Sequence, residues 1–184
     1  ITERERYAWD DRFNEGKQSN FGYNDFEISR AKETLKGFES NDNIANESMK
    51  NAIVAKNLCV GKRKISDTTK DGSAECSVMS EDKYMFGLIT PYEYMRISLD
   101  DNCKLPSNDS CSNYNYMYNK DVVSWSLTAE DTDDNNYSVY YFDGTVFESG
   151  RASIQRRFYV TAYINARALF KSGNGTVDDP YIIR

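Results

Sequence analysis

Ser124-Trp125-Ser126-Leu127-Thr128 begins the stretch that decides the fold, because three strand-like runs follow it before the chain reaches Arg184. The runs span residues 137–142, 145–148 and 158–166, and aromatic and β-branched residues dominate them. Such side chains favour a pleated, half-buried surface. The sequence therefore predicts a β-sheet toward the C-terminal end of the chain.

The first of these runs carries apolar or aromatic side chains on both faces. Successive side chains of a strand point to opposite sides, so Val139 and Tyr141 share one face, whereas Tyr140 and Phe142 share the other. A strand covered on both faces is typical of the centre of a sheet. We also expect one buried cluster that includes Trp125, Leu127, Tyr141, Val160 and Ile164.

Length and charge limit the class of protein. The chain has 184 residues, enough for a sizeable core, and a single extracellular domain over 1–184 is the simplest organisation, with 1–20 as a connector to an upstream anchor or helix. The formal net charge of -6, from 23 basic and 29 acidic residues, argues against nucleic acid and against an anionic membrane surface as partners. The chain has no histidine, which excludes a Ser-His-Asp or Cys-His enzyme.

Nothing in the sequence has the pattern of a membrane span or a signal peptide. A span needs a run of about 18 apolar residues, which the chain lacks. The first residues, Ile1-Thr2-Glu3-Arg4-Glu5-Arg6, do not resemble a natural start. We therefore expect an extracellular, cell-surface-attached ectodomain whose export signal or anchor lies upstream.

Two helices are expected in the first part of the chain. Residues 24–38 place apolar side chains on one helical face, with Asn24 or Asp25 as the N-cap. Residues 44–56 predict a second helix, with Asn43 as its cap. Packing against a sheet is the expected role of both helices.

A short buried strand and a third helix are expected next. The strand lies within residues 84–90, and Thr90-Pro91 then stops it. Thr90 as the N-cap and Pro91 at the first helical position predict a helix start. The residues expected to face inward from this helix are Tyr92, Met95 and Leu99. Together with the C-terminal sheet, these elements predict an α+β fold.

The four cysteines allow several interpretations. An even count in a chain of this kind predicts two disulfides, and we favour Cys59–Cys76 with Cys103–Cys111 because each pair brackets a polar segment. A four-thiolate zinc site is the alternative, although structural zinc normally uses ligands two to four residues apart. Free thiols in a cytosolic protein are the remaining possibility.

Four motifs carry a resemblance to a known family. They are Trp125-Ser126-Leu127-Thr128-Ala129 and residues 139–144, 159–164 and 173–183. They resemble the Trp-Thr-Leu-Thr-Pro, Val-Tyr-x-x-x-x-Gly, Arg-Pro-Val-Ile-x-Leu and Gly-Asp-Gly-Thr-x-x-x-Pro-Tyr-x-Ile motifs of a domain on exported proteins of Gram-positive gut bacteria. That domain often follows a pilin-like or membrane-anchor N-terminus. The resemblance covers most of the chain from about Ile53.

The resemblance implies a C-type-lectin-like fold. Such a fold has two or three short helices beside a small antiparallel sheet, with long loops on one side. Two positions depart from the family pattern, since Ala129 replaces a proline and Tyr159-Val160 replaces Arg-Pro. Both departures affect the expected conformation near Trp125.

The acidic loop at residues 130–136 concentrates oxygen ligands, which makes calcium a candidate cofactor. The EF-hand pattern fails, because the sixth position from Asp131 is not glycine and Phe142 occupies the twelfth. The sugar-reading tripeptides Glu-Pro-Asn and Gln-Pro-Asp are also absent. A solvated acidic loop is the alternative interpretation, and the prediction that we adopt contains no metal ligand and no required cofactor.

Tyrosine and asparagine alternate at residues 113–118, a combination typical of adaptable binding loops. The alternative is a tyrosine-rich loop folded onto the domain. Loops on a rigid scaffold commonly carry function, so we predict that loops 102–119 and 129–136 lie side by side and form a binding face. Its predicted contacts are Tyr114, Tyr116, Tyr118, Asp131, Asp133 and Asn135.

These features predict a non-enzymatic extracellular binding or adhesion module of a bacterial surface or pilus-associated protein. The expected partner is a host or bacterial surface glycan or protein. The alternative is a structural subunit of a surface fibre, whose loops contact other subunits. An enzyme is the third hypothesis, with Glu75, Glu81 and Glu93 as the source of a glycosidase carboxylate pair.

Overall fold

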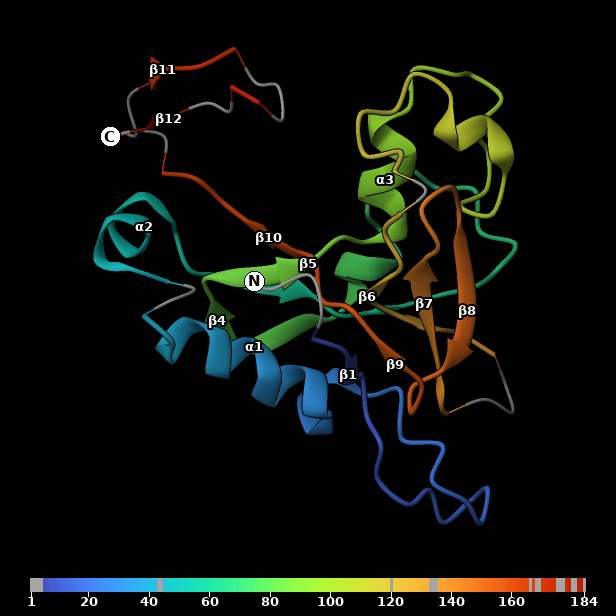
Figure 1. Cartoon of the computed structure of the whole chain (residues 1–184). Helices are drawn as coiled ribbons and strands as arrows, with labels where there is room; N and C mark the ends of the chain where they lie inside the picture. Colours follow the sequence, from blue (N-terminus) through green and yellow to red (C-terminus); the bar gives the residue numbers. More distant parts are fainter. Residues whose placement is uncertain are drawn as a thin grey trace.

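The computed structural model describes residues 5–42, 45–119, 121–132, 136–165, 167, 170–174, 178–179 and 182–183. Within these residues the fold is α+β, with short helices around several small, mainly antiparallel sheets (Figure 1). The helices are α1 (Arg30–Ser40), α2 (Glu47–Ala52) and α3 (Pro91–Ile97), with 3-10 turns η1 (Phe26–Ile28), η2 (Glu75–Ser77) and η3 (Asp109–Ser112). The strands are β1 (Tyr7–Ala8), β2 (Lys56–Cys59), β3 (Lys62–Arg63), β4 (Met79–Tyr84), β5 (Phe86–Leu88), β6 (Ser124–Glu130), β7 (Ser138–Phe142), β8 (Phe147–Arg151), β9 (Gln155–Arg156), β10 (Val160–Ala162), β11 (Phe170–Ser172) and β12 (Ile182–Ile183).

The largest sheet has the strand order β3-β6-β7-β8, so β7 is a central strand as predicted. Strands β6, β7 and β8 form an antiparallel meander, and β3 adds to β6 in parallel. Val139 and Tyr141 pack into one apolar cluster, whereas Tyr140 and Phe142 belong to a second. The two faces of β7 therefore separate two halves of the core.

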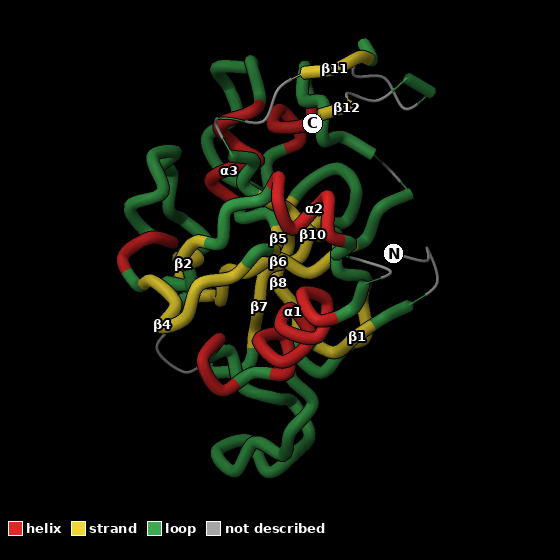
Figure 2. Tube along the Cα trace, turned by 90° about the vertical axis from the view of Figure 1, so that its left-hand side faces the viewer, coloured by secondary structure: helices red, strands yellow, loops and turns green. Residues whose placement is uncertain are grey.

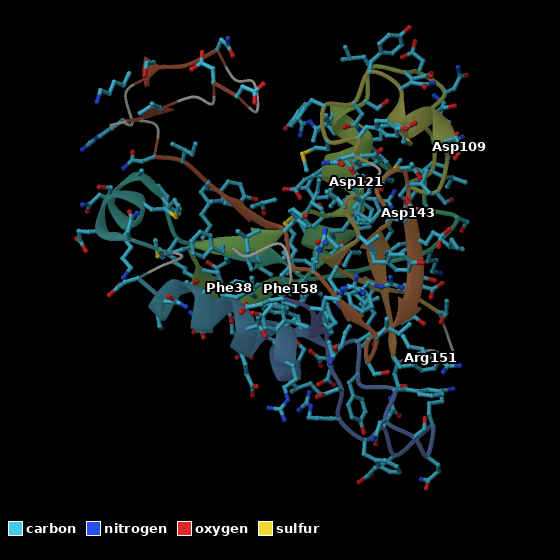
Figure 3. All side chains as sticks on the ribbon, in the orientation of Figure 1. Phe38, Asp109, Asp121, Asp143, Arg151 and Phe158 are labelled. Atoms are coloured by element: carbon cyan, nitrogen blue, oxygen red, sulfur yellow. A yellow bond between two sulfur atoms is a disulfide. The ribbon has the colours of Figure 1, made fainter. Side chains whose placement is uncertain are left out.

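The first cluster lies between the sheet and α1, and two tryptophans cross-link it. The indole N–H of Trp9 donates to the Ser126 carbonyl, and the indole N–H of Trp125 donates to the Tyr7 carbonyl, both at 3.0 Å. Both indoles are fully buried. The segment that sequence analysis assigned to a connector thus contributes strand β1 and Trp9 to the core. Phe38 of α1 and Phe158 pack against each other in the same cluster (Figure 3).

The predicted buried cluster is confirmed for part of its members. Trp125 and Leu127 are buried, and Tyr141 and Val160 are partly buried against the same cluster. Ile164 is 59% exposed, so the prediction for this residue is wrong. Strand β10 ends at Ala162, and Ile164 makes an isolated bridge with Ile53 at the edge of the fold.

The first two helices begin later than predicted. Helix α1 starts at Arg30 because the Ser29 hydroxyl accepts the Lys32 N–H and caps it, whereas Asp25 caps only the short turn η1. The Asn24 amide instead donates to the carbonyls of Glu130 and Ser138 at the β6–β7 turn. Helix α2 starts at Glu47, with Asn46 as its N-cap. The predicted start of this helix, residues 43–44, lies outside the described residues.

Helix α3 begins where the sequence predicts. The Thr90 hydroxyl accepts the Glu93 N–H, and the Glu93 carboxylate accepts the Thr90 N–H, which completes a capping box with Pro91 at the first helical position. Met95 is fully buried, as expected. Leu99 is 79% exposed because the helix ends at Ile97, so its predicted inward position is wrong.

Both predicted disulfides, Cys59–Cys76 and Cys103–Cys111, are present. The first closes what we call the Arg63 loop (residues 60–75), and the second lies within the tyrosine loop (residues 102–119). The strands gather at the centre of the molecule and the loops extend outward from them (Figure 2). The two disulfides therefore fasten loops to a compact strand core.

Candidate functional site

The tyrosine loop is held in place by a buried asparagine. The Asn115 side chain is 7% exposed, and its amide donates to the carbonyls of Tyr94, at 3.0 Å, and Cys111, at 2.9 Å. Its oxygen accepts the Met117 N–H at 3.0 Å. The amide nitrogen and the amide oxygen of Asn115 thus both have hydrogen-bond partners, as is expected of buried polar groups. Asn115 is therefore an internal anchor of the loop.

The tyrosines on either side of this anchor point outward. Tyr114 is 81% exposed and Tyr116 is 82% exposed, whereas Tyr118 is 40% exposed. Tyr114 also has a φ angle of 53°, in the left-handed region. A non-glycine residue held there carries about 1–2 kcal/mol of backbone strain. Retained strain of this kind clusters at functional sites, so this loop is a candidate recognition element.

The tyrosine loop rests on the turn between β7 and β8. The Asn119 N–H, at the end of the loop, donates to the Gly144 carbonyl at 3.0 Å, and the phenol of Tyr94 on α3 donates to the Thr145 carbonyl of the same turn at 2.6 Å. The Phe147 N–H also donates to the Pro106 carbonyl at 2.9 Å. Figure 3 shows Asp109 of the loop and Asp143 of the turn at the same end of the molecule. The loop is therefore a supported platform.

A groove of about 520 Å³ runs between α3, the tyrosine loop and β10. Volumes of this size are typical of small-ligand sites. Tyr92 and Arg96 are one turn apart on α3, so they present to the groove from the same helix face. Its lining residues, which define the α3 groove, are Ile89, Tyr92, Glu93, Arg96, Ile97, Tyr116, Met117, Thr161 and Tyr163.

Glu93 supplies a fixed carboxylate to the α3 groove. Its Oε2 accepts both the N–H and the hydroxyl of Thr90 at 2.8 Å. Burial raises the pKa of the Glu93 carboxyl, and the nearby Glu75 charge raises it further, while the Thr90 bonds oppose the shift. Burial likewise raises the pKa of Tyr92 to about 12. The groove therefore combines the protonated phenol of Tyr92, the oriented carboxyl group of Glu93 and the Arg96 cation.

A buried ion pair supports this wall of the groove. Arg63 and Glu75 are both fully buried, and Nη1 of Arg63 lies 3.0 Å from Oε1 of Glu75. The same Oε1 accepts the Tyr92 N–H at 3.2 Å. The first turn of α3 is thus tied to the Arg63 loop. Because Glu75 is committed to these bonds, it does not have the free carboxylate that a glycosidase pair requires.

The structure does not bring the two predicted binding loops together. The Asp131 N–H donates to the Arg63 carbonyl at 2.9 Å, and the Asn136 carbonyl accepts the Asn24 N–H at 2.8 Å, both at the β6–β7 turn. The tyrosine loop lies at the opposite end of β7, beside Gly144. Figure 1 shows the two regions at opposite ends of the meander. The prediction of one shared face is wrong, because a hairpin separates the loops at its two ends by the length of its strands.

The remaining predicted contacts fall into two groups. Asp131 is half-buried beside the Arg63 loop, and Asp133 and Asn135 lie outside the described residues. The calcium hypothesis for loop 130–136 thus concerns residues that the structure describes incompletely. Elsewhere in the described part of the chain, no group of three or more cysteines or acidic residues is placed to hold a metal ion. No helix among the described residues has the length and apolar character of a membrane span.

Several groove residues were not predicted from the sequence. Tyr92 was expected inside the core, and neither Arg96 nor Tyr163 was a predicted site residue. The four-residue spacing of Tyr92 and Arg96 on a correctly predicted helix was a signal for one wall of the groove. Nothing local to Tyr163 could have placed it there, since its position depends on the pairing of β10 with β5.

No protein-family model, curated protein or solved structure matches this chain. The α3 groove and the tyrosine loop are therefore the features of this chain that bear on its function.

Proposed function

We propose that this chain is a non-enzymatic, extracellular binding module of a cell-surface protein, with a C-type-lectin-like fold. Two disulfides suit an oxidising compartment. Short helices beside small antiparallel sheets, with long supported loops, suit the lectin-like assignment. The binding face is the α3 groove with the exposed part of the tyrosine loop.

The observation that carries this proposal is the pairing of a buried anchor with exposed tyrosines. Asn115 fixes the loop, while Tyr114 and Tyr116 leave most of their surface in solvent. Rigid tyrosines offer large amphipathic contact area at low cost in conformational entropy. A loop that only connects two elements has no need to hold exposed tyrosines in a fixed position.

A surface glycan fits the groove lining best. The faces of Tyr92, Tyr116 and Tyr163 can pack against the apolar C–H faces of sugar rings. Glu93 accepts hydrogen bonds and Arg96 donates them, which matches the alternating donors and acceptors of sugar hydroxyls. The ligand is bound without covalent chemistry.

The test is a glycan array probed with the wild-type chain in calcium and in a chelator. Tyr116→Ala should lose the signal of each bound glycan while its melting temperature stays unchanged, because the side chain is 82% exposed. Phe13→Ala is the matched control, since Phe13 is an aromatic residue that is 51% exposed and lies outside the groove. It should bind as wild type does.

The other outcomes separate the alternatives. Binding to whole cells that depends on Tyr116, without any bound glycan, would identify a protein ligand. Normal binding by Tyr116→Ala together with failed fibre assembly would reject the proposal in favour of a structural subunit. Loss of signal in the chelator alone would establish calcium as a cofactor.

A further inference from the structure

A second hollow, separate from the α3 groove, gathers three arginines. It has a volume of about 290 Å³ and lies beside the β1–β9 pair. We call it the arginine pocket, and its lining residues are Arg6, Asp121, Val123, Gln155, Arg156 and Arg157. It shares none of the groove's lining residues. A local excess of positive charge is unexpected in a chain with a net charge of -6.

The pairing of β1 with β9 brings the first described residues of the chain beside residues 155–157. Strands β1 and β9 pair antiparallel, with Tyr7 opposite Arg156 and Ala8 opposite Gln155. Arg6 directly precedes β1, Arg157 directly follows β9, and both line the pocket. Like charges that line one pocket repel each other, and an anion bound among them relieves that repulsion.

Arg156 is held in a fixed orientation by aromatic rings. Its guanidinium carbon lies 3.4 Å from the centroid of the Tyr141 ring and 5.1 Å from that of Trp125. Its Nε is buried and has no hydrogen-bond partner within the described structure. Burial lowers the pKa of Arg156, while the Tyr141 phenol and the Glu148 carboxylate act in the opposite direction. The cation is therefore oriented and incompletely neutralised.

Arg157 is positioned by uncharged partners. Its Nη1 donates to the Asp121 carbonyl at 3.2 Å and to the Tyr159 hydroxyl at 3.3 Å. None of the ion pairs found among the described residues includes Arg6, Arg156 or Arg157. The Asp121 carboxyl is the acidic group in the lining. The pocket thus keeps a surplus of guanidinium donors.

We infer that the arginine pocket binds an oxyanionic group, a carboxylate, sulfate or phosphate, carried by a ligand of the size of one sugar. The planar fork of arginine matches the paired oxygens of these groups. The pocket is several times larger than the ~30 Å³ that one water occupies in the liquid, which leaves room for the body that carries the charge. Gln155 can donate to that body.

Arginine side-chain N–H resonances followed by NMR test this inference directly. The probes are sulfate, phosphate and glucuronate, with chloride and glucose as references, all at one ionic strength. Saturable shifts of the Arg156 and Arg157 resonances are expected with the oxyanions. The strongest response to glucuronate would identify an acidic sugar, and the strongest to sulfate or phosphate would identify a sulfated or phosphorylated group.

Substitutions distinguish a site from general charge attraction. Arg6→Gln and Arg157→Gln should each weaken binding about tenfold, the factor of one charge-assisted hydrogen bond. Arg151→Gln is the control with the same change of charge, because Arg151 packs over Phe21 away from the pocket, and it should bind as wild type does. Tyr116→Ala should also bind normally, which keeps this test independent of the α3 groove.

Equal shifts with chloride and with the oxyanions would overturn the inference. An equal loss of affinity in Arg151→Gln and Arg157→Gln would overturn it too, because the effect would then follow net charge alone.

Discussion

The two disulfide-stapled loops use the same covalent device and direct their side chains in opposite ways. The Arg63 loop folds inward around a fully buried ion pair, with Nη2 of Arg63 donating to the carbonyls of Asp67 and Thr69. The tyrosine loop buries one neutral amide, that of Asn115, and turns Tyr114 and Tyr116 outward. Two loops closed by the same kind of bond can thus differ in role according to where their side chains point. The inward contacts of the Arg63 loop stabilise the fold, and we propose that the tyrosine loop serves recognition.

The largest expected effect comes from the Arg63 loop. Arg63→Ala should lower the free energy of unfolding by about 3–5 kcal/mol, because it leaves the Glu75 carboxylate buried without its partner. Urea unfolding at neutral pH measures the change. Arg30→Ala is the control, since the Arg30–Glu33 pair is exposed and should contribute little.

A double substitution sharpens this prediction. Arg63→Met combined with Glu75→Leu removes both charges and should recover part of the lost stability. A double variant as unstable as Arg63→Ala would show that packing around the loop, and not the unpaired charge, causes the loss.

The disulfides should differ in what their removal affects. From chain entropy, loss of the Cys59–Cys76 bridge should lower the free energy of unfolding by about 3 kcal/mol, and loss of Cys103–Cys111 by about 2.5 kcal/mol. Paired Cys→Ser variants and thermal unfolding measure this. Only the second variant should also lose ligand binding at temperatures where it is folded. Equal loss of binding in both would remove the functional distinction between the loops.

Asn115→Ala should lower the free energy of unfolding by less than Arg63→Ala does, and it should also weaken ligand binding. The variant leaves the carbonyls of Tyr94 and Cys111 without their donor, a loss of about 1–3 kcal/mol. The released loop then no longer holds Tyr114 and Tyr116 in place, so affinity should fall even in the fully folded protein. Hydrogen exchange of the Met117 amide reports the release. Unchanged exchange with normal binding would contradict the anchoring role.

Local features of the sequence predicted part of this architecture. Thr90, Pro91 and Glu93 define the start of α3 by contacts within one turn, and alternation along β7 defines its two faces. The cysteine pairing followed from the polar segments that each pair brackets. By contrast, residues that act over long distances were not predictable, because the partners of Arg63 and Asn24 lie on other elements. The position of the acidic loop relative to the tyrosine loop depends on the hairpin, which no local pattern reports.

The smallest expected change in stability comes from relieving backbone strain, and it gives the most direct test of the tyrosine loop. Tyr114 and Gln18 are the non-glycine residues with left-handed backbone in the described chain, with φ angles of 53° and 49°. Replacing either by glycine removes the penalty of a side chain in that conformation, so each variant should gain up to about 1 kcal/mol in the free energy of unfolding.

The role of the tyrosine loop is tested most directly by ligand binding of Tyr114→Gly and Gln18→Gly, measured together with their unfolding curves. We predict that both variants are at least as stable as wild type and that only Tyr114→Gly loses affinity for the surface ligand. Full binding by a stable Tyr114→Gly variant would contradict this prediction, because the strained, exposed tyrosine would then have no part in recognition.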